Sequence, residues 1–159
     1  MLELIFHIWV LLKFNLYTDI MKRVYIDGVF DLFHRGHLES IIKAKSALDD
    51  PDNTYLIVGI VSDNDCSSYK RNPIINEEDR VEIIKSIKYV DQVIFPCPLN
   101  VTLEFIKENS IDLVVHGFSC EADREKQKDF FAEIKTAGYF KEIDYYSKIS
   151  TTEIISKLK

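Results

Sequence analysis

Residues 28 to 37 read Gly28-Val29-Phe30-Asp31-Leu32-Phe33-His34-Arg35-Gly36-His37 and lie between an extended run and a helical pattern. The apolar run before them ends at Asp27, and apolar residues recur at helical spacing from Leu38 to Leu48. This pattern predicts a strand that turns directly into a helix. Free N–H groups and the positive end of a helix dipole bind anions, so we predict a phosphate site at this turn.

Two histidines occupy this turn. His34 and His37 stand three residues apart around Gly36, near enough for both imidazoles to face one anion, and the glycine lets an anion approach the backbone. Neither is placed to activate a nucleophile, because no Ser or Cys stands beside them. We therefore predict that they donate hydrogen bonds to the charge that develops on a phosphoryl group in the transition state.

The pattern G-x-F-D-x-x-H-x-G-H resembles the signature of the cytidylyltransferases that make CDP-choline, CDP-ethanolamine and CDP-glycerol, which belong to the HxGH nucleotidyltransferases. The resemblance runs from about residue 22 to the C-terminus. It implies that the phosphate of a small phosphorylated alcohol attacks the α-phosphorus of CTP directly, without a covalent enzyme intermediate, and releases pyrophosphate. It also implies catalytic roles for His34 and His37 and nucleotide contacts for Val29, Phe30, Asp31 and Gly36.

Composition places the chain among ordinary globular proteins. Its 159 residues suffice for one domain with a hydrophobic core, and 47% hydrophobic with 29% charged residues is typical of a folded domain. A net charge of −6 argues against a nucleic-acid partner. Cys66, Cys97 and Cys120 form no CxxC pair, which argues against a zinc site and a disulfide framework and fits a reducing, cytoplasmic location.

Residues 1–20 differ from the rest of the chain. Their apolar run is interrupted by His7 and Lys13, is too short to span a bilayer, and lacks the basic leader and cleavage site of a signal peptide. We therefore expect no transmembrane segment. Three interpretations stay open: a helix that packs on the domain or a partner, a weak membrane-surface anchor, or an extension upstream of a working start at Met21. The first and third are favoured, and we assign residues 21–159 to the catalytic domain.

Beyond Met21, extended apolar runs alternate with helical patterns. Such alternation is typical of right-handed crossovers and a parallel sheet covered on both faces. We predict a single Rossmann-like α/β domain with a five-stranded, mainly parallel sheet, whose ligands bind at the carboxyl ends of the strands. Strands are predicted at residues 24–29, 55–61, 92–95, 111–116 and 140–145, and helices at 36–48, 77–87, 101–109, 125–137 and 151–158.

A second block follows the strand at 55–61. A polar loop is expected from Ser62 to Asn76, and Asn76 is predicted to cap the next helix and to place Arg80 in its first turn, facing the pocket. The spacing of Lys70 from the strand at 55–61 and from Asn76 resembles that of the family. The resemblance implies that Lys70, inside this loop, contacts the CTP phosphates and the incoming phosphate monoester. A flexible ammonium suits that role, because it reduces the repulsion between two anions. Arg80 is expected to contact the nucleotide.

The fourth extended run ends in His116-Gly117, at the same edge of the predicted sheet as His34 and His37. Three of the four histidines at one sheet edge favour a site over separate structural roles. His-Gly resembles the ethanolamine-type members of the family, and the resemblance implies that His116 and Gly117 contact the nucleotide.

Ser150 and Glu153 have the spacing of a capping box at the start of the last helix. The segment also resembles the family string R-T-x-G-[IV]-S-T-[ST], but Tyr145 stands in place of the Arg and Lys148 in place of the Gly. A bidentate guanidinium clamp is thereby lost, and Lys148 restores the charge without the fork geometry. The resemblance implies phosphate contacts for Lys148, Ile149, Ser150, Thr151 and Thr152.

A further departure from the family concerns the acceptor. Leu99 stands where choline- and ethanolamine-type members carry an aromatic residue, so we expect loss of the cation–π attraction for a quaternary ammonium. Ethanolamine phosphate should then compete well with choline phosphate.

Residues 88–93 are similar to a segment that helps form the homodimer in the family. Mg²⁺ is expected with CTP; we assign no protein ligand to it, and Asp31 is the nearest candidate.

The sequence thus predicts transfer of CMP from CTP to ethanolamine phosphate or choline phosphate by a homodimer, in the synthesis of phospholipid precursors. Two alternatives stay open: an enzyme that acts on glycerol 3-phosphate, and a non-catalytic nucleotide-binding HxGH protein. The intact pair of His34 and His37 argues against the second.

Overall fold

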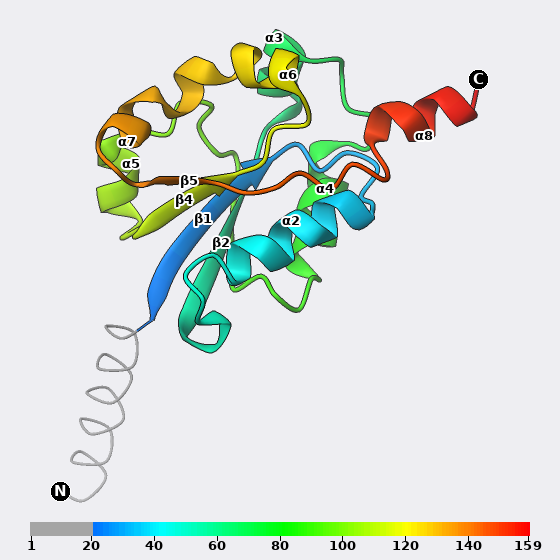
Figure 1. The fold of residues 1–159 in the computed structure, drawn as a ribbon. Helices are drawn as coiled ribbons and strands as arrows, with labels where there is room; N and C mark the ends of the chain where they lie inside the picture. Colours follow the sequence, from blue (N-terminus) through cyan, green and yellow to red (C-terminus); the bar gives the residue numbers. More distant parts are fainter. Residues whose placement is uncertain (1–20) are drawn as a thin grey trace, which may run out of the picture.

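Five strands form one sheet in the order β3-β2-β1-β4-β5, and every pairing within it is parallel. The computed structural model describes residues 21–159, and Figure 1 shows the sheet with helices on both sides. The predicted α/β domain with a five-stranded parallel sheet is therefore confirmed. The strands are β1 (Lys22–Gly28), β2 (Thr54–Ile60), β3 (Gln92–Ile94), β4 (Leu113–His116) and β5 (Phe140–Glu142).

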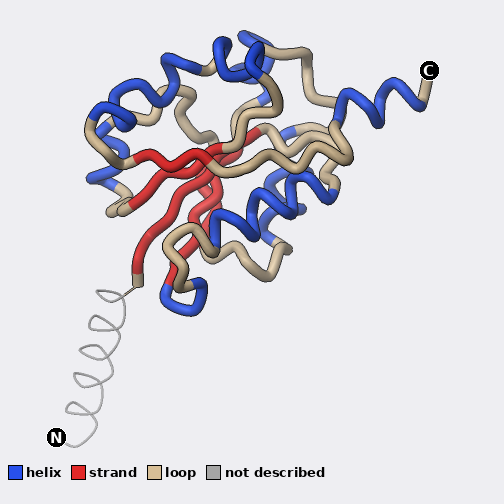
Figure 2. Tube along the Cα trace, viewed as in Figure 1, coloured by secondary structure: helices blue, strands red, loops and turns tan. Residues whose placement is uncertain are grey.

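Short helices connect the strands, as the crossovers of a parallel sheet require. Figure 2 shows the strands lying between two groups of helices. The α-helices are α2 (Arg35–Lys45), α3 (Asp63–Tyr69), α4 (Glu77–Lys85), α5 (Leu103–Glu108), α6 (Glu121–Lys126), α7 (Ala132–Thr136) and α8 (Thr151–Lys157), and the 3₁₀ helices are η1 (Pro51–Asn53) and η2 (Lys128–Phe131).

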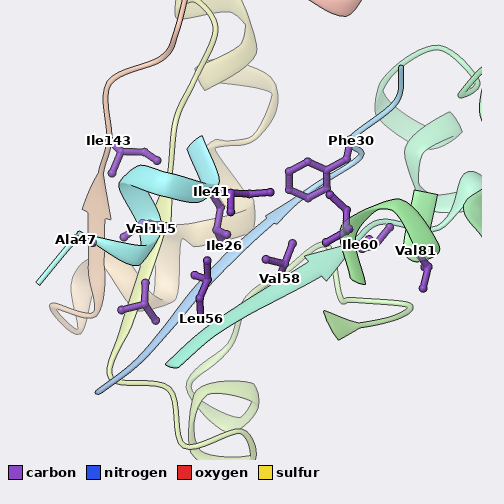
Figure 3. Packing of buried hydrophobic residues seen from close by; sticks show 13 residues of the cluster. Ile26, Phe30, Ile41, Ala47, Leu56, Val58, Ile60, Val81, Val115 and Ile143 are labelled. Carbon is purple, nitrogen blue, oxygen red and sulfur yellow. The ribbon is translucent and has the colours of Figure 1, made fainter. Parts of the chain in front are cut away.

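Side chains of β1 alternate between two hydrophobic cores, one on each face of the sheet. Val24 and Ile26 belong to the core that α2 and α4 cover, whereas Tyr25 belongs to the core that α5 and α7 cover. Figure 3 shows Ile26 and Ile41 of the first core close together. Each fully buried isoleucine contributes about 1.5–3 kcal/mol. Because both faces are covered, the strands read as continuous apolar runs.

Two expectations for the helices are corrected. The polar loop expected from Ser62 to Asn76 contains α3, which begins because the Ser62 hydroxyl accepts a hydrogen bond from the N–H of Asp65. The single helix predicted at 125–137 is divided into α6, η2 and α7. It is interrupted at Gln127 and Phe131, where ψ is 7° and 8°, and both side chains are buried.

β1 lies at the point where the order of the strands reverses. The chain runs from β1 to β2 on one side, and β4 then pairs with β1 on the other side. In an open parallel sheet, ligands bind in the crevice at this point, beyond the carboxyl ends of the strands.

No helix within residues 21–159 is long and apolar enough to cross a membrane. Residues 1–20, with their three open interpretations, lie outside the described part of the chain.

Candidate active site

A cavity of about 660 Å³ opens at the carboxyl ends of β1 and β4. Two segments contribute most to its lining: residues 26–37, here named the turn wall, and residues 119–127, here named the helix wall. The three histidines predicted to share one sheet edge all line this cavity. Of the residues predicted from the sequence, Val29, Phe30, Asp31, His34, His37, Lys70, His116, Gly117, Ser150, Thr151 and Thr152 line it, whereas Gly36, Arg80, Lys148 and Ile149 do not.

Backbone hydrogen bonds fix the tautomers of the two histidines in the turn wall. The N–H of Gly36 donates to Nδ1 of His34 over 3.0 Å, and the N–H of His34 donates to Nδ1 of His37 over 3.4 Å. A neutral imidazole that accepts at Nδ1 carries its proton on Nε2. The rings are stacked, with centroids 3.9 Å apart and planes inclined by 20°. The pair therefore holds two Nε2–H donors on nearly parallel rings.

Their surroundings keep both imidazoles neutral. Burial lowers the pKa of His34. Burial, followed by the neighbouring His34 ring, lowers the pKa of His37 from 6.5 to about 3; Asp31 opposes this shift and Lys70 adds to it. A positive charge on either ring is thus disfavoured near neutral pH. The arrangement is suited to hydrogen-bond donation and not to general acid catalysis.

Gly36 lies outside the cavity lining but determines where the His34 ring can lie. A Cβ at this position would stand 2.8 Å from Cε1 and 2.9 Å from Nδ1 of His34, and 3.3 Å from the carbonyl oxygen of Ile149. A side chain there would therefore displace the ring or the C-terminal turn. The cavity lining supports this packing role for Gly36 and does not support the nucleotide contact expected from the sequence.

Asp31 fastens the segment after Lys70 to the turn wall. Its Oδ1 accepts a hydrogen bond from the N–H of Ile75 (2.9 Å), and its Oδ2 accepts from the N–H of Ile74 (3.0 Å) and from Arg71 (2.7 Å). Burial alone would raise the pKa of this carboxyl, but these hydrogen bonds outweigh burial and leave the pKa below its usual value. Three hydrogen bonds thus use most of the acceptor capacity of this carboxylate, which argues against Asp31 as a magnesium ligand. Within residues 21–159, no three His, Cys, Asp or Glu side chains are grouped to hold a metal ion.

Lys70 reaches the cavity at the C-terminal end of α3. Its ammonium lies 3.4 Å from Oδ1 of Asp123 in the helix wall, and the neighbouring Arg71 pairs with Asp31. Lys126, also in the helix wall, is the third cation of the lining. Among the described residues it forms no ion pair. Lys126 is therefore the cavity cation whose charge remains available to a ligand.

Arg80 is fully buried and does not face the cavity, which corrects the expected orientation of this side chain. Its guanidinium donates to the carbonyl oxygens of Val29 (2.5 Å), Val61 (3.0 Å) and Ile75 (3.1 Å) and to Oδ1 of Asp63 (2.7 Å). The predicted cap of α4 forms, but Arg80 points inward from it. Because a buried guanidinium must satisfy its donors, Arg80 ties together the loops that follow β1 and β2.

The turn before α8 borders the cavity beside the histidine pair. The Thr151 hydroxyl donates to the carbonyl oxygen of Asp31 (3.1 Å) and lies 3.4 Å from Nε2 of His34. The predicted cap also forms, because the Ser150 hydroxyl accepts from the N–H of Glu153 (3.1 Å). Hydroxyl groups and one histidine donor thus converge at this corner. An anion placed there would find the Nε2–H of His34 within reach, whereas the proton of the Thr151 hydroxyl is already donated to Asp31.

Two residues of the C-terminal segment differ from their expected places. Lys148 is exposed in a turn and is not part of the lining. Tyr145 does line the cavity, and burial, followed by the nearby Asp123 and Cys120, raises the pKa of its phenol. The positive charge that Tyr145 lacks is therefore not restored by Lys148 in this arrangement.

A side cavity of about 30 Å³ adjoins the main one and has room for about two water-sized groups. The buried Asp27 carboxylate lies in it, 3.1 Å from Nδ1 of His116. Leu99 lines it too, as expected for the acceptor pocket, but the pocket is not without an aromatic face. Aromatic rings of this side cavity belong to Tyr69, Phe130 and Phe131.

Sequence reasoning missed Asp27 and the helix wall. Asp27 had a usable signal, since it is a charged residue at the end of a buried strand, directly before the glycine of the motif. Asp123, Lys126 and Gln127 had none, because a charged helix is usually a solvated one. Only their position beside β4 and the turn wall brings them to the cavity.

Comparison with known proteins agrees with the resemblance noted in the sequence. A family model described as cytidylyltransferase-like matches residues 25–157. Choline-phosphate cytidylyltransferase A of Homo sapiens is 38% identical over 136 residues, which cover 86% of this chain and 36% of that protein. The probable ethanolamine-phosphate cytidylyltransferase of Encephalitozoon cuniculi is 33% identical over 138 residues, which cover 87% of this chain and 41% of that protein. This chain thus spans less than half the length of either relative.

The fold has a counterpart among solved structures. The lipopolysaccharide core biosynthesis protein from Thermoplasma volcanium matches with a TM-score of 0.59 and 25% sequence identity, over 79% of this chain and 97% of that chain. The five-stranded parallel sheet and its flanking helices therefore belong to an architecture found in other proteins.

Proposed function

The chain belongs to the cytidylyltransferase-like family, and on that premise we propose that it transfers a cytidylyl group from CTP to a small phosphorylated alcohol. In this reaction a phosphate oxygen of the alcohol attacks the α-phosphorus of CTP, a new P–O bond forms, and the bond to the β-phosphoryl group breaks. Pyrophosphate leaves with the electron pair. The observation that carries the proposal is the stacked pair of neutral histidines with fixed Nε2–H donors.

The two Nε2–H groups would bind the phosphoryl oxygens on which negative charge develops. Their positions are fixed before the reaction, since each Nδ1 already accepts a backbone N–H. Donors fixed in this way need no reorganisation as charge develops, which is the largest single contribution in many enzymes of this kind. To bind a nucleotide phosphate as well, the Thr151 hydroxyl beside His34 would exchange the carbonyl oxygen of Asp31 for a phosphate oxygen.

Positive charge for the triphosphate comes from the C-terminal end of α3 and from the helix wall in this proposal. Lys70 would contact the phosphates of both substrates and reduce the repulsion between them. Lys126 would supply the further charge, because it lines the cavity without an acidic partner among the described residues. Magnesium would accompany CTP through its phosphate oxygens, since this ion commonly binds through substrate phosphates and keeps several waters.

The side cavity favours an acceptor that carries a primary ammonium. Asp27 offers a buried carboxylate, and the rings of Tyr69, Phe130 and Phe131 offer faces that attract a cation. Its volume of about 30 Å³ suits an ammonium group better than the bulkier trimethylammonium of choline. We therefore propose ethanolamine phosphate as the preferred acceptor.

Two further points belong to the proposal. The protein would act as a homodimer. The support is the motif of residues 88–93, which overlaps β3, an edge strand of the sheet. It would work in the cytoplasm, where its three free cysteines remain reduced. Light scattering of the purified chain measures directly whether it forms a homodimer.

The test is pyrophosphate release from CTP with three acceptors: ethanolamine phosphate, choline phosphate and glycerol 3-phosphate. We expect release with ethanolamine phosphate at the highest kcat/KM. A tenfold or greater preference for choline phosphate would contradict the assignment of the side cavity. Binding of CTP without release from any acceptor would favour a non-catalytic nucleotide-binding protein.

A further inference from the structure

Asp123 is held in the helix wall by donors from its own segment. Its Oδ2 accepts hydrogen bonds from the N–H and the hydroxyl of Ser119, each over 3.1 Å, and its Oδ1 accepts from Nε2 of Gln127 over 2.7 Å. Gln127 is itself buried, with 4% of its surface exposed. Three donors therefore fix the orientation of this carboxylate, independently of any ligand.

The remaining partner of Asp123 comes from another part of the chain. The Lys70 ammonium lies 3.4 Å from Oδ1 of Asp123, and among the described residues it has no other acidic partner. Burial tends to raise the pKa of Asp123, but Lys70 and the hydrogen bonds from Ser119 and Gln127 outweigh it, so the pKa is lowered and the carboxylate is charged at neutral pH. The ion pair thus joins the end of α3 to the helix wall.

Lys70 depends on this contact more than its neighbour Arg71 does. Arg71 is anchored through Asp31, a carboxylate that is buried in the turn wall and also binds two backbone N–H groups. The Lys70 side chain is 39% exposed, and apart from Asp123 it contacts the ring of Tyr69, 5.3 Å from its centroid. A lysine on a flexible four-carbon stem loses much rotational freedom when it is held in one place. A fixed carboxylate reduces that loss before the substrates arrive.

We propose that Asp123 is a positioning residue that holds the Lys70 ammonium inside the cavity, ready to contact the phosphates of CTP and of the acceptor. The inference rests on the proposed function, in which Lys70 brings the two anions together. A partly exposed ion pair at 3.4 Å is weak. Arriving phosphates therefore displace Asp123 readily, and the carboxylate directs Lys70 without trapping it.

A double-mutant cycle tests whether Asp123 acts through Lys70. The variants are Asp123→Asn, Lys70→Ala and the pair together, and the measurements are kcat, KM for each substrate, and CTP affinity by calorimetry. Asp123→Asn should lower kcat/KM by about ten- to a hundredfold, since a misplacement of about 1 Å can cost about 10²-fold. In the Lys70→Ala background the same substitution should change neither kcat/KM nor CTP affinity further. Glu125→Gln is the matched control, because Glu125 lies on the same helix, pairs with Lys128 and is not part of the lining.

Two results would overturn the inference. An equal loss in both backgrounds would mean that Asp123 acts independently of Lys70, and tighter CTP binding by Asp123→Asn would mean that the carboxylate competes with the nucleotide. If Asp123→Asn melts early because the Ser119 contacts are lost, Asp123→Glu keeps the charge but moves the carboxylate by one methylene. A loss that requires Lys70 then supports the inference, and a loss that does not require it overturns it.

Wild-type measurements separate this inference from the proposed function. Absence of both CTP binding and pyrophosphate release in the wild-type chain would contradict the function. An active wild-type chain whose cycle is additive would contradict only the role of Asp123.

Discussion

The turn wall and the helix wall border the same cavity but are held in different ways. In the turn wall, the functional side chains bond to backbone groups: His34 and His37 accept backbone N–H groups of their own turn, and Asp31 accepts two from residues 74 and 75. In the helix wall, side chains bond mainly to other side chains, as in the pairs of Asp123 with Lys70 and with Gln127.

This difference separates two tasks. Donors that stabilise a transition state must already be in place, and backbone hydrogen bonds provide such fixed geometry. Groups that receive a charged substrate must exchange partners when it binds, and weak, partly exposed ion pairs allow this. We therefore expect changes in the turn wall to affect turnover or stability strongly and changes in the helix wall to affect substrate binding moderately.

The largest effect is expected for His37→Ala. Removal of one positioned donor should lower kcat about 10²–10³-fold, with a smaller change in KM, because the donor serves the developing charge. Steady-state pyrophosphate release measures this. Arg35→Ala is the control in the same turn, since its side chain is 68% exposed and lies outside the cavity lining. Near-normal turnover of His37→Ala would remove this histidine from the mechanism.

The neutral state of His37 predicts a pH dependence of stability. Its pKa is lowered from 6.5 to about 3 in the folded chain, so below pH 6.5 the unfolded chain binds a proton that the folded chain does not. The stability that this group contributes is complete above pH 6.5. It should fall by on the order of 1.4 kcal/mol per pH unit as the pH decreases toward 3.

Urea unfolding at pH 7, 6, 5 and 4 measures this dependence. The wild-type chain should lose stability more steeply than His37→Asn, in which the titrating group is absent. Equal slopes for the two chains would show that His37 is not held neutral in the turn wall.

Asp31→Ala should break the connection between the turn wall and the segment after Lys70. Two backbone N–H groups and Arg71 lose their acceptor, which should cost about 1–3 kcal/mol of unfolding free energy. Faster tryptic cleavage after Arg71 reports the release of this segment. Asp52→Ala, an exposed aspartate of η1, is the control. An unchanged magnesium requirement would agree with the fastening role, whereas a raised one would restore Asp31 as a metal ligand.

The smallest effect is expected for Lys126→Ala in the helix wall. Loss of one exposed charge should raise KM for CTP about two- to fivefold and leave the affinity for CMP nearly unchanged. Lys148→Ala should leave both values unaltered, since this lysine lies outside the cavity lining. If Lys148→Ala raises KM for CTP and Lys126→Ala does not, the C-terminal turn supplies the charge instead.

Much of the fold was predictable, because the crossovers and the apolar strands are local patterns. The helix boundaries near residues 62–76 and 125–137 were not, since α3 depends on a serine cap and the division of α6 from α7 on burial of Phe131. The meeting of the His34 and His37 rings was predictable from their spacing. The direction in which Arg80 points was not, because a capped helix start leaves open whether its first turn faces the cavity or the core.

The sequence by itself determined the strand-turn-helix unit and its pair of histidines, because the hydrogen bonds that shape this turn join residues two or three positions apart. Only the tertiary structure decided what surrounds that unit. Asp31 meets Ile75 across 44 positions of the chain, and its carbonyl oxygen meets Thr151 across 120. No local pattern encodes such contacts, since they arise when the parallel sheet brings the carboxyl ends of its strands to one edge.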